Sequence, residues 1–246
     1  FSHALEHTIV NKVTHENISA LFMKRLNDEF NGQLSLAIEI FNDRYHKRFL
    51  HQLVASQLDM DRLDYLKRDS FYTGVSEGVI SSDRIIKMLN VRNDALCVEQ
   101  KGIYSIEKFI VARRLMYWQV YLHKAVVSAE FMLVNILRRA KFLAEQGTEL
   151  FCSPALHRFL YNRLGKPEFD NDPTVLADFA KLDDYDIMGA IKVWADHDDK
   201  VLSRLCYGAL NRRLFRVSIN EEPVTDKRMD EVRSAIMQQY DLFADE

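Results

Sequence analysis

The sequence predicts a mainly α-helical protein, and three observations support this prediction. Glycine and proline are scarce, with 8 and 4 copies in 246 residues, so long segments carry no helix breaker. Hydrophobic residues make up 48% of the chain, which is enough for a sizeable core. Residues 106–145 contain neither glycine nor proline, so one long helix or two nearly collinear helices are expected there.

Four shorter helices are expected before that long segment. Thr14 and Ser82 precede helical patterns and are the predicted caps of the second and the fourth helix. Gly74 and Gly78 follow the third helix and end it. The four expected helices cover residues 2–11, 15–31, 45–69 and 82–90.

The periodicity changes after the fourth helix. The segment ALCVEQKGIYSIE, residues 95–107, alternates between apolar and polar residues around Lys101–Gly102. Alternation with a period of two is typical of strands, so this segment predicts a β-hairpin.

The composition changes again after Gly147, where the segments are shorter and more charged and include Pro154, Pro167 and Pro173. We therefore expect a lobe boundary near residues 147–152, with one domain over residues 1–148 and a second over residues 149–246. In the second part, the elements expected are helices at 184–196, 198–212 and 225–242 and a strand, LFRVSI, at 214–219.

Charge and cysteine content exclude several classes of protein. There are 33 basic and 36 acidic residues, a net charge of −3, so binding to nucleic acid is not expected. Cys97, Cys152 and Cys206 form no CxxC pair, which indicates reduced thiols and neither a disulfide framework nor a zinc ribbon. The most apolar region, residues 115–137, contains charged side chains and is not expected to cross a membrane. These features favour a soluble, cytoplasmic protein.

Asp61, Tyr65 and Asp69 follow one another at a spacing of four, which places them on one face of the third helix. Two carboxylates and a phenol on one face can hold a metal ion and a sugar. With Arg62 and Lys67 beside them, they can equally form a salt-bridged, solvated surface. The residues alone leave both interpretations open.

Arg113, Tyr117 and Tyr121 show the same spacing in the long helical segment. Arg113 has apolar neighbours on both sides and is expected to be partly buried, where it needs an anionic partner. That partner is either a phosphate or carboxylate of a ligand, or an Asp or Glu from the earlier helices.

The first ten residues, FSHALEHTIV, contain His3, Glu6 and His7 in the pattern H-x-x-E-H. This pattern also occurs in zinc proteases of the inverzincin type. A pattern this short matches by chance, so it does not favour a protease by itself. His15, followed by a glutamate, lies a little further along.

Together these segments resemble the HD-domain phosphohydrolases, specifically the branch of dNTP triphosphohydrolases that includes dGTPases and the SAM-and-HD-domain dNTPases. FSH at residues 1–3 is similar to the end of the family's GHGPFSH stretch. DMDRLDYLKRD at 59–69 matches the form DxDxxDYxxRD. Arg113 with the YLHK segment at 121–124 matches R-x7-Y-x-HK. The three motifs stand in the family's order and cover about residues 1–145.

The resemblance implies an HD-domain helical core with one small β-hairpin, plus a C-terminal helical lobe that carries a short strand. It also implies a divalent metal ion (Mg, Mn, Fe or Zn) with Asp61 as a ligand, because hard cations prefer carboxylate oxygens. The implied reaction is attack of a metal-activated water on the α-phosphorus of a dNTP, which releases a deoxynucleoside and tripolyphosphate.

The resemblance also assigns roles around the substrate. Tyr65 packs against the deoxyribose and Asp69 accepts a hydrogen bond from its 3′-hydroxyl. Arg62 and Arg113 neutralise the triphosphate. The remaining assignments are Tyr121 beside the sugar, Tyr117 in the pocket wall or core, His3 on the phosphates, and Glu6 with His15 as a carboxylate–imidazole pair for proton transfer.

Two departures from the family pattern stand out. The family's metal site also needs an earlier histidine and an HD pair before the FSH segment, and we expect residues upstream of Phe1. The one HD pair in the sequence, His197–Asp198, lies far away in ADHDDK, and that run is expected to cap the helix beginning near 198. The second departure is Tyr117, where the SAM-and-HD branch has a histidine.

Two other functions stay open. One is another HD phosphohydrolase, acting on nucleoside monophosphates or on a signalling nucleotide. The other is a degenerate nucleotide-binding scaffold. The family commonly forms homo-oligomers regulated by nucleotide activators. The basic residues Arg138, Arg139, Lys141, Arg212 and Arg213 are either activator sites or ordinary solvated charge.

Overall fold

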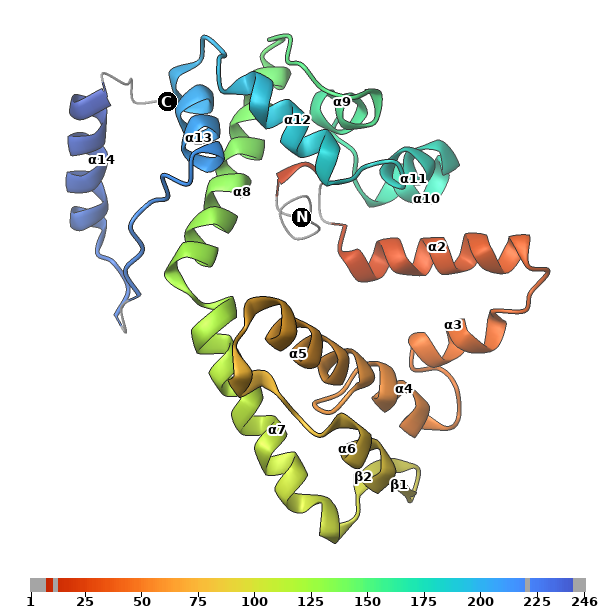
Figure 1. Ribbon diagram of the computed structural model, residues 1–246. Coiled ribbons are helices and arrows are strands. Elements are labelled where there is room, and N and C mark those ends of the chain that lie inside the picture. The colour runs from red at the N-terminus through yellow and green to blue at the C-terminus, as the bar shows by residue number, and fades with distance from the viewer. Residues whose placement is uncertain (1–7, 11–12, 220–221, 241–246) are drawn as a thin grey trace.

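The computed structural model describes residues 8–10, 13–219 and 222–240 of the chain (Figure 1). Over these residues the protein is mainly helical and contains one two-stranded antiparallel sheet, which confirms the predicted fold class. The helix expected at 2–11 falls almost entirely outside the described residues.

The bounds of the helices and strands are α2 (His15–Glu29), α3 (Ser35–Phe41), α4 (Arg48–Val54), α5 (Met60–Thr73), α6 (Ser82–Met88), β1 (Leu89–Arg92), β2 (Ala95–Val98), α7 (Ile103–Met116), α8 (Lys124–Glu145), α9 (Pro154–Tyr161), α10 (Lys166–Asn171), α11 (Pro173–Phe179), α12 (Asp184–Trp194), α13 (Lys200–Leu210) and α14 (Asp226–Tyr240). Two short 3₁₀ turns, η1 (Ser76–Gly78) and η2 (Gln100–Gly102), and a π-helical turn, η3 (Tyr117–Tyr121), complete the order.

Capping residues set the first helix boundaries. The predicted cap of α2 is confirmed, because Thr14 and Asn17 form a reciprocal capping box at the start of the helix. The predicted cap of α6 is wrong by one residue. The helix begins at Ser82, its N-cap is Ser81, and the Ser81 side chain makes no capping hydrogen bond.

The single helix predicted at 45–69 is wrong, because the chain breaks between α4 and α5. Asp59 causes the break: it is only 2% exposed, and its carboxylate accepts hydrogen bonds from the backbone of Ser56 and of Arg62. A side chain that satisfies backbone donors on both sides of itself competes with a continuous helix. The second helix, α5, runs on to Thr73 and ends at Gly74, whose φ of 71° is left-handed.

A hairpin exists, but it covers residues 89–98; the prediction at 95–107 is wrong, because residues 103–107 belong to α7. Strands β1 and β2 pair antiparallel around Asn93 and Asp94, which have φ values of 52° and 59°. Two left-handed residues in a two-residue loop match the twist of a hairpin, and Asn and Asp tolerate that conformation. The expected turn at Lys101–Gly102 lies in η2 instead. Gly102 is needed there for packing, since a Cβ would lie 2.9 Å from the Cβ of Met88.

The expectation of nearly collinear helices over 106–145 is also wrong. The segment consists of α7 and α8, which are bent by 59° at η3. A π-type hydrogen bond of 2.7 Å from the Leu122 amide to the Tyr117 carbonyl closes the turn between them. No single helix among the described residues is long and apolar enough to cross a membrane, although α7 and α8 with the turns beside them pass that test as a bent pair.

The C-terminal helices α12, α13 and α14 confirm the predictions at 184–196, 198–212 and 225–242. The strand predicted at 214–219 is wrong, because that segment has no regular structure and no described strand pairs with it. Apolar alternation alone does not form a strand when no neighbouring edge offers hydrogen bonds.

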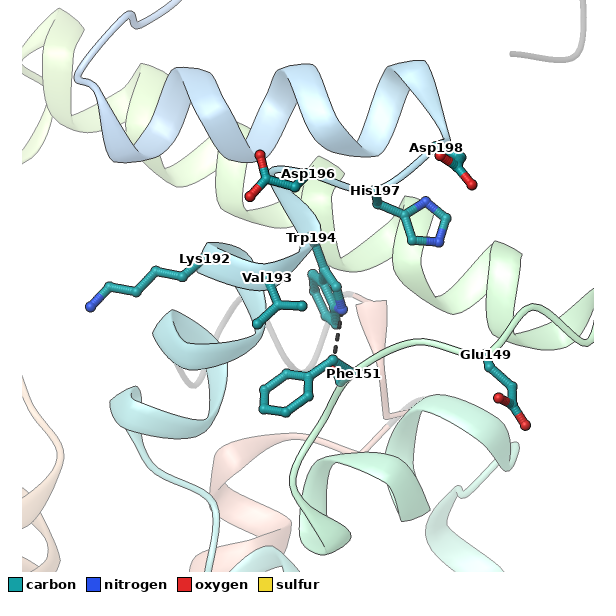
Figure 2. A pocket seen from close by; sticks show the side chains of 8 residues that line it. All are labelled: Glu149, Phe151, Lys192, Val193, Trp194, Asp196, His197 and Asp198. Carbon is teal, nitrogen blue, oxygen red and sulfur yellow. Dashed lines mark hydrogen bonds between the residues drawn. The ribbon is translucent and has the colours of Figure 1, made fainter.

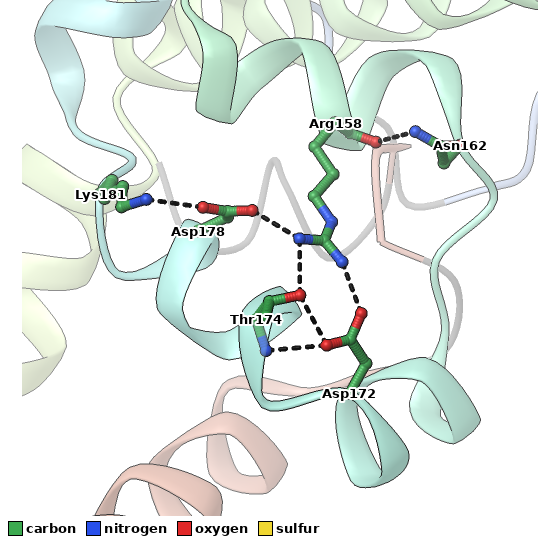
Figure 3. Close-up of polar contacts among 6 residues, drawn as sticks. All are labelled: Arg158, Asn162, Asp172, Thr174, Asp178 and Lys181. Atoms are coloured by element: carbon green, nitrogen blue, oxygen red, sulfur yellow. Dashed lines mark hydrogen bonds and ion pairs between the residues drawn. The ribbon is translucent and has the colours of Figure 1, made fainter.

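Arg158 fastens α9 to α11 (Figure 3). Its guanidinium donates to Asp172 at 2.7 Å, to Asp178 at 2.6 Å and to the Thr174 hydroxyl at 2.9 Å. Hydrogen bonding to these acids raises the pKa of Arg158. The pKa values of both acids lie below their usual range, mainly through the Thr174 bonds at Asp172 and through bonds from Lys181 and Arg158 at Asp178. This cluster is therefore a structural clamp.

The described residues form two hydrophobic cores. The larger joins the chain near Ile9 and Ile18 to the second half of α8 and to α9–α13, with Phe159 and Trp194 fully buried in it. The smaller lies among α5, α6 and α7, around Leu66, Ile85 and Met116. Figure 1 shows the two groups of helices at opposite ends of the α7–α8 segment. The predicted division into domains at residue 148 stays a prediction.

Candidate functional site

The π-helical turn η3 brings two predicted site residues against α5. The hydroxyl of Tyr121 donates a hydrogen bond of 2.6 Å to the Asp69 carboxylate. The rings of Tyr121 and Tyr65 meet edge to face at 5.9 Å, and those of Tyr121 and Tyr117 at 5.2 Å. Two motifs that lie 52 residues apart in the sequence thus meet in one cluster. A π turn carries an extra residue per turn and is frequent at functional sites.

Arg113 stands at the edge of this cluster, one turn before η3. Its guanidinium carbon lies 5.8 Å from the centre of the Tyr117 ring, and one of its nitrogens donates a 2.9 Å hydrogen bond to Gln57. Within the described part of the chain Arg113 forms no ion pair. Its intramolecular partner is therefore a neutral amide, and its charge stays available to an anionic ligand.

Gln57 was not among the predicted site residues. It lies in the break between α4 and α5, which the sequence pattern did not predict. The sequence contains only an indirect indication of Gln57. It lies between the end of α4 and Asp59, whose carboxylate stabilises the break between the two helices.

Arg62 has a different environment from Arg113. It pairs with the buried carboxylate of Asp59 and donates a 2.5 Å hydrogen bond to the Ser56 carbonyl. Its Nε atom is buried and has no hydrogen-bond partner among the described residues. Arg62 therefore fastens the start of α5, and its predicted contact with a triphosphate stays a prediction.

The local charges act on the two tyrosines of the cluster. Burial raises the pKa of Tyr121, and the hydrogen bond to Asp69 raises it further. Burial is also the main cause of a raised pKa at Tyr65, with Tyr117 adding to it, while Arg113 and Arg62 act in the opposite direction. Both phenols consequently stay protonated at neutral pH and can serve as hydrogen-bond donors.

The two interpretations of the acidic helix α5 both apply, at different residues. Asp64 pairs with Arg68 at 2.8 Å on an exposed surface, as a solvated face would. Asp69 instead turns to Tyr121 and belongs to the cluster. Asp61 is exposed in the first turn of α5 and contacts no described polar partner.

The described residues do not form a complete metal site. No group of three or more His, Cys, Asp or Glu side chains among them could hold a metal ion, and the role of Asp61 as a ligand stays a prediction. His3 and Glu6, together with the H-x-x-E-H pattern, lie outside the described residues. His15 begins α2, and its Nε2 lies 3.0 Å from the Glu16 carboxylate.

His123 and Lys124 end the third motif at the start of α8. The Nδ1 atom of His123 accepts a 3.3 Å hydrogen bond from the Ala125 amide and caps the helix. This part of the motif therefore also fixes where α8 begins after η3.

The His197–Asp198 pair borders a separate surface cleft of about 580 Å³, shown in Figure 2. The Trp194 indole lines this cleft and donates a hydrogen bond of 2.9 Å to the Phe151 carbonyl. Among the described residues, the pair belongs to no group of three or more His, Cys, Asp or Glu side chains that could hold a metal ion. His197 accepts from the amide of Asp199, whose carboxylate caps α13 by accepting from the Leu202 amide at 2.7 Å, so the predicted capping role of this run is confirmed.

Two of the basic residues considered as activator sites have structural partners. Arg139 forms a bidentate, mostly buried ion pair with Asp199, which ties α8 to α13. Lys141 donates to the carbonyls of Phe159 and Asn162 at the end of α9, and burial lowers its pKa.

Known proteins are similar to this chain over segments that include the site. Residues 80–149, which include the Arg113–Lys124 motif, match the family model described as HD associated region. The chain superposes on a phosphohydrolase from Bacteroides thetaiotaomicron with a TM-score of 0.94 and 61% identity. The chain is similar to HD-superfamily phosphohydrolases. That superposition covers 99% of this chain and 60% of the Bacteroides protein.

Two curated relatives extend the comparison. An uncharacterized protein of Bacillus subtilis, YwfO, is 36% identical over 178 residues, which is 72% of this chain and 39% of that protein. A protein of Dictyostelium discoideum named as a deoxynucleoside triphosphate triphosphohydrolase SAMHD1 homolog is 29% identical over 160 residues, or 57% of this chain and 30% of its own. The chain thus spans well under half the length of these curated relatives.

Proposed function

We propose that the cluster of Tyr65, Asp69, Arg113, Tyr117 and Tyr121 forms part of the substrate site of a metal-dependent phosphohydrolase. Its proposed substrates are dNTPs, and its products are a deoxynucleoside and tripolyphosphate. The observation that carries this proposal is the hydrogen bond between Tyr121 and Asp69, because it joins two separated motifs beside an unpaired arginine.

The geometry supports different roles for Asp69 and Arg113 in binding the substrate. Tyr121 occupies one oxygen of the Asp69 carboxylate, Oδ2, and leaves the other free to accept from a sugar hydroxyl. Gln57 holds the guanidinium of Arg113 while leaving further N–H groups free for phosphate oxygens. Aromatic rings between these two groups suit the apolar face of a sugar.

The proposed metal would supply a polarised phosphoryl oxygen and an activated water. The resemblance assigns Asp61 as its ligand, and that carboxylate is exposed in the first turn of α5. The residues proposed to bind the sugar and the phosphates can be tested in the absence of the metal.

The names of the relatives support a phosphohydrolase in general and a dNTP substrate in particular. The Bacteroides protein is named a phosphohydrolase and the Dictyostelium protein a deoxynucleoside triphosphate triphosphohydrolase. We take the second as the more specific guide because the Tyr121–Asp69 pair suits a sugar hydroxyl and Arg113 beside it suits a phosphate.

The first experiment is a hydrolysis assay with a panel of dNTPs and Mn²⁺ or Mg²⁺, with products separated by anion exchange. It is run on this chain and on the chain together with any sequence that its gene encodes before Phe1. Tripolyphosphate that disappears in Asp61→Ala but persists in Asp64→Ala supports the proposal. Asp64 is the matched control, since it lies on the same helix but pairs on the exposed face.

Other outcomes select the alternatives. Monophosphate as the product indicates another HD nucleotide phosphohydrolase. Binding of dNTPs without turnover in the extended chain indicates a nucleotide-binding scaffold.

Binding by this chain can be tested separately from turnover. Arg113→Gln should weaken dNTP binding about tenfold or more, because a hydrogen bond to a charged group contributes about 1.5–3 kcal/mol. Calorimetric titration measures this loss, and Arg114→Gln, a neighbouring exposed arginine, is the control. Equal losses in both variants would contradict a specific role for Arg113.

A homo-oligomer, with a nucleotide activator, stays a prediction of the resemblance. Sedimentation velocity of the chain, with and without a dNTP, tests it. A single species at the mass of one chain under both conditions would contradict it.

A further inference from the structure

A second pocket lies away from the tyrosine cluster, between α2, the end of α3 and the start of α10. Its volume is about 320 Å³, and it shares no residue with the proposed substrate site. In Figure 1, α2 runs beside α10 and α11 on one side and faces α3 on the other.

Three cations from three different elements converge on this pocket. Lys24 comes from α2, Arg44 from the segment after α3, and Lys166 from α10, against the single carboxylate of Asp170. None of the three forms an ion pair with another described residue. The pocket is therefore positively charged in a chain whose net charge is −3, and such a concave charged surface concentrates anions.

The floor of the pocket is apolar. Val13 and Phe169 are buried, at 2% and 3% exposure, and Leu21 and Ile38 lie partly buried beside them. The Phe169 ring is fixed from behind, because it packs at 5.8 Å against Phe179 in the larger core. A rigid apolar floor favours a ligand that has an apolar body as well as a charge.

Two amides complete the lining. The oxygen of Asn17 accepts from the Thr14 backbone, which leaves its amino group as a free donor. The amino group of Asn42 donates to the Ile38 carbonyl, which leaves its oxygen as an acceptor. The pocket can therefore make directional polar contacts in addition to charge.

The backbone holds Arg44 at the pocket. Asp43, with a φ of 54°, adopts the left-handed conformation after α3, and the Arg44 amide then donates to the Glu39 carbonyl at 2.9 Å. This turn reverses the chain and sends the Arg44 side chain toward α2 and α10.

We propose that this pocket is a second ligand site, which binds a small phosphate monoester whose ester group is aromatic or otherwise apolar. The dianionic phosphate lies among Lys24, Arg44 and Lys166, and the apolar group lies on the floor formed by Leu21, Ile38 and Phe169. The proposal is independent of the proposed hydrolase activity.

The test is calorimetric titration of the chain with 1-naphthyl phosphate and with inorganic phosphate, in the presence of EDTA so that no metal-dependent hydrolysis occurs. Naphthyl phosphate should bind at least tenfold more tightly than inorganic phosphate, because only it can use the apolar floor. The double variant Lys24→Gln/Lys166→Gln should weaken its binding by tenfold or more, and raised salt should do the same.

Two controls locate the binding. Lys192→Gln removes an exposed lysine at the other cleft and should leave the affinity unchanged. Arg113→Gln removes the cation of the proposed substrate site and should also leave it unchanged. Loss of binding in Arg113→Gln but not in the double lysine variant would place the ligand in the tyrosine cluster and overturn the proposal.

A separate variant tests whether the apolar floor of the pocket contributes to binding. Ile38→Asn should bring the affinity for naphthyl phosphate down toward that for inorganic phosphate, while circular dichroism confirms that the fold is kept. Equal affinity for the two probes in the unchanged chain, or no binding of either, would overturn the proposal.

Discussion

The hydroxyl of Tyr121 is the atom that joins α5 to η3, so its removal gives the most direct test at the scale of one residue. Tyr121→Phe should lower the free energy of unfolding by about 1 kcal/mol, because the partly buried hydrogen bond to Asp69 is lost while the ring remains. Urea denaturation measures the change. Tyr104→Phe, at a tyrosine that is 80% exposed, should change stability by less than about 0.5 kcal/mol.

The same hydroxyl predicts a dependence on alkaline pH. Burial and the bond to Asp69 raise the pKa of Tyr121 in the folded protein above its ordinary value of 10.0. The folded state therefore holds this proton more tightly than the unfolded state, and the stabilisation is complete below about pH 10 and is lost as the pH rises further.

The measurement is urea unfolding at about pH 8 and about pH 11. Wild type should lose more stability across that interval than Tyr121→Phe does. The variant should keep part of the dependence, because the pKa of Tyr65 is raised in the same direction. Identical losses in the two proteins would show that Tyr121 is not the group responsible.

Individual site residues differ in how far the sequence predicts them. Tyr65, Asp69, Arg113, Tyr117 and Tyr121 were predicted from regular spacing and motif order, and the structure brings them together. Gln57 was not, because an amide in a short irregular segment has no periodicity, and its role depends on an arginine 56 residues later in the chain.

The start of α5 is the element on which the site depends, and Asp59 defines it. Its buried carboxylate caps the helix and pairs with Arg62. Asp59→Ala should lower the free energy of unfolding by about 2–4 kcal/mol, because it removes a cap and leaves a partly buried arginine without its anion.

Chemical denaturation of two further variants separates these causes. Asp59→Asn keeps an acceptor for the Arg62 backbone amide but not the charge, and should lie between wild type and Asp59→Ala. Asp64→Ala breaks an exposed pair on the same helix and should cost no more than about 0.5 kcal/mol. A small effect of Asp59→Ala would mean that packing alone positions α5.

Elements with strong local signals were predicted well, and those decided by tertiary contacts were not. The starts of α2 and α12 carry capping residues that act within four residues of themselves. The break before α5 depends on the side chain of Asp59, which bonds to Ser56 and Arg62, and the 59° bend at η3 lies where Tyr121 contacts Asp69 of a distant segment. Apolar periodicity does not record such contacts, so it predicted continuous helices in both places.

At the scale of the whole molecule, the two cores meet mainly through the α7–α8 segment. The larger core takes residues from both sides of 148, including Leu137 of α8 and Phe159 of α9. The smaller core contains Leu66 and Met116 and contributes the tyrosine cluster. Two cores joined by a bent helical segment can open separately if each keeps its own set of buried contacts.

Hydrogen exchange on Leu66→Ala tests whether they do. Leu66 is fully buried in the smaller core, so its truncation should destabilise that core by about 2–5 kcal/mol. Amides of α5, α6 and α7 should then exchange faster, while those of α9, α12 and α13 keep their protection. Leu156→Ala, at a fully buried residue of the larger core, should give the reverse pattern.

If either variant lowers protection throughout the chain, the two cores unfold as one cooperative unit, and a ligand bound at the tyrosine cluster would stabilise the entire chain. If protection falls only locally, such a ligand should protect α5–α7 alone, and the limit of the protected region would also show whether the chain divides near residue 148 or at η3.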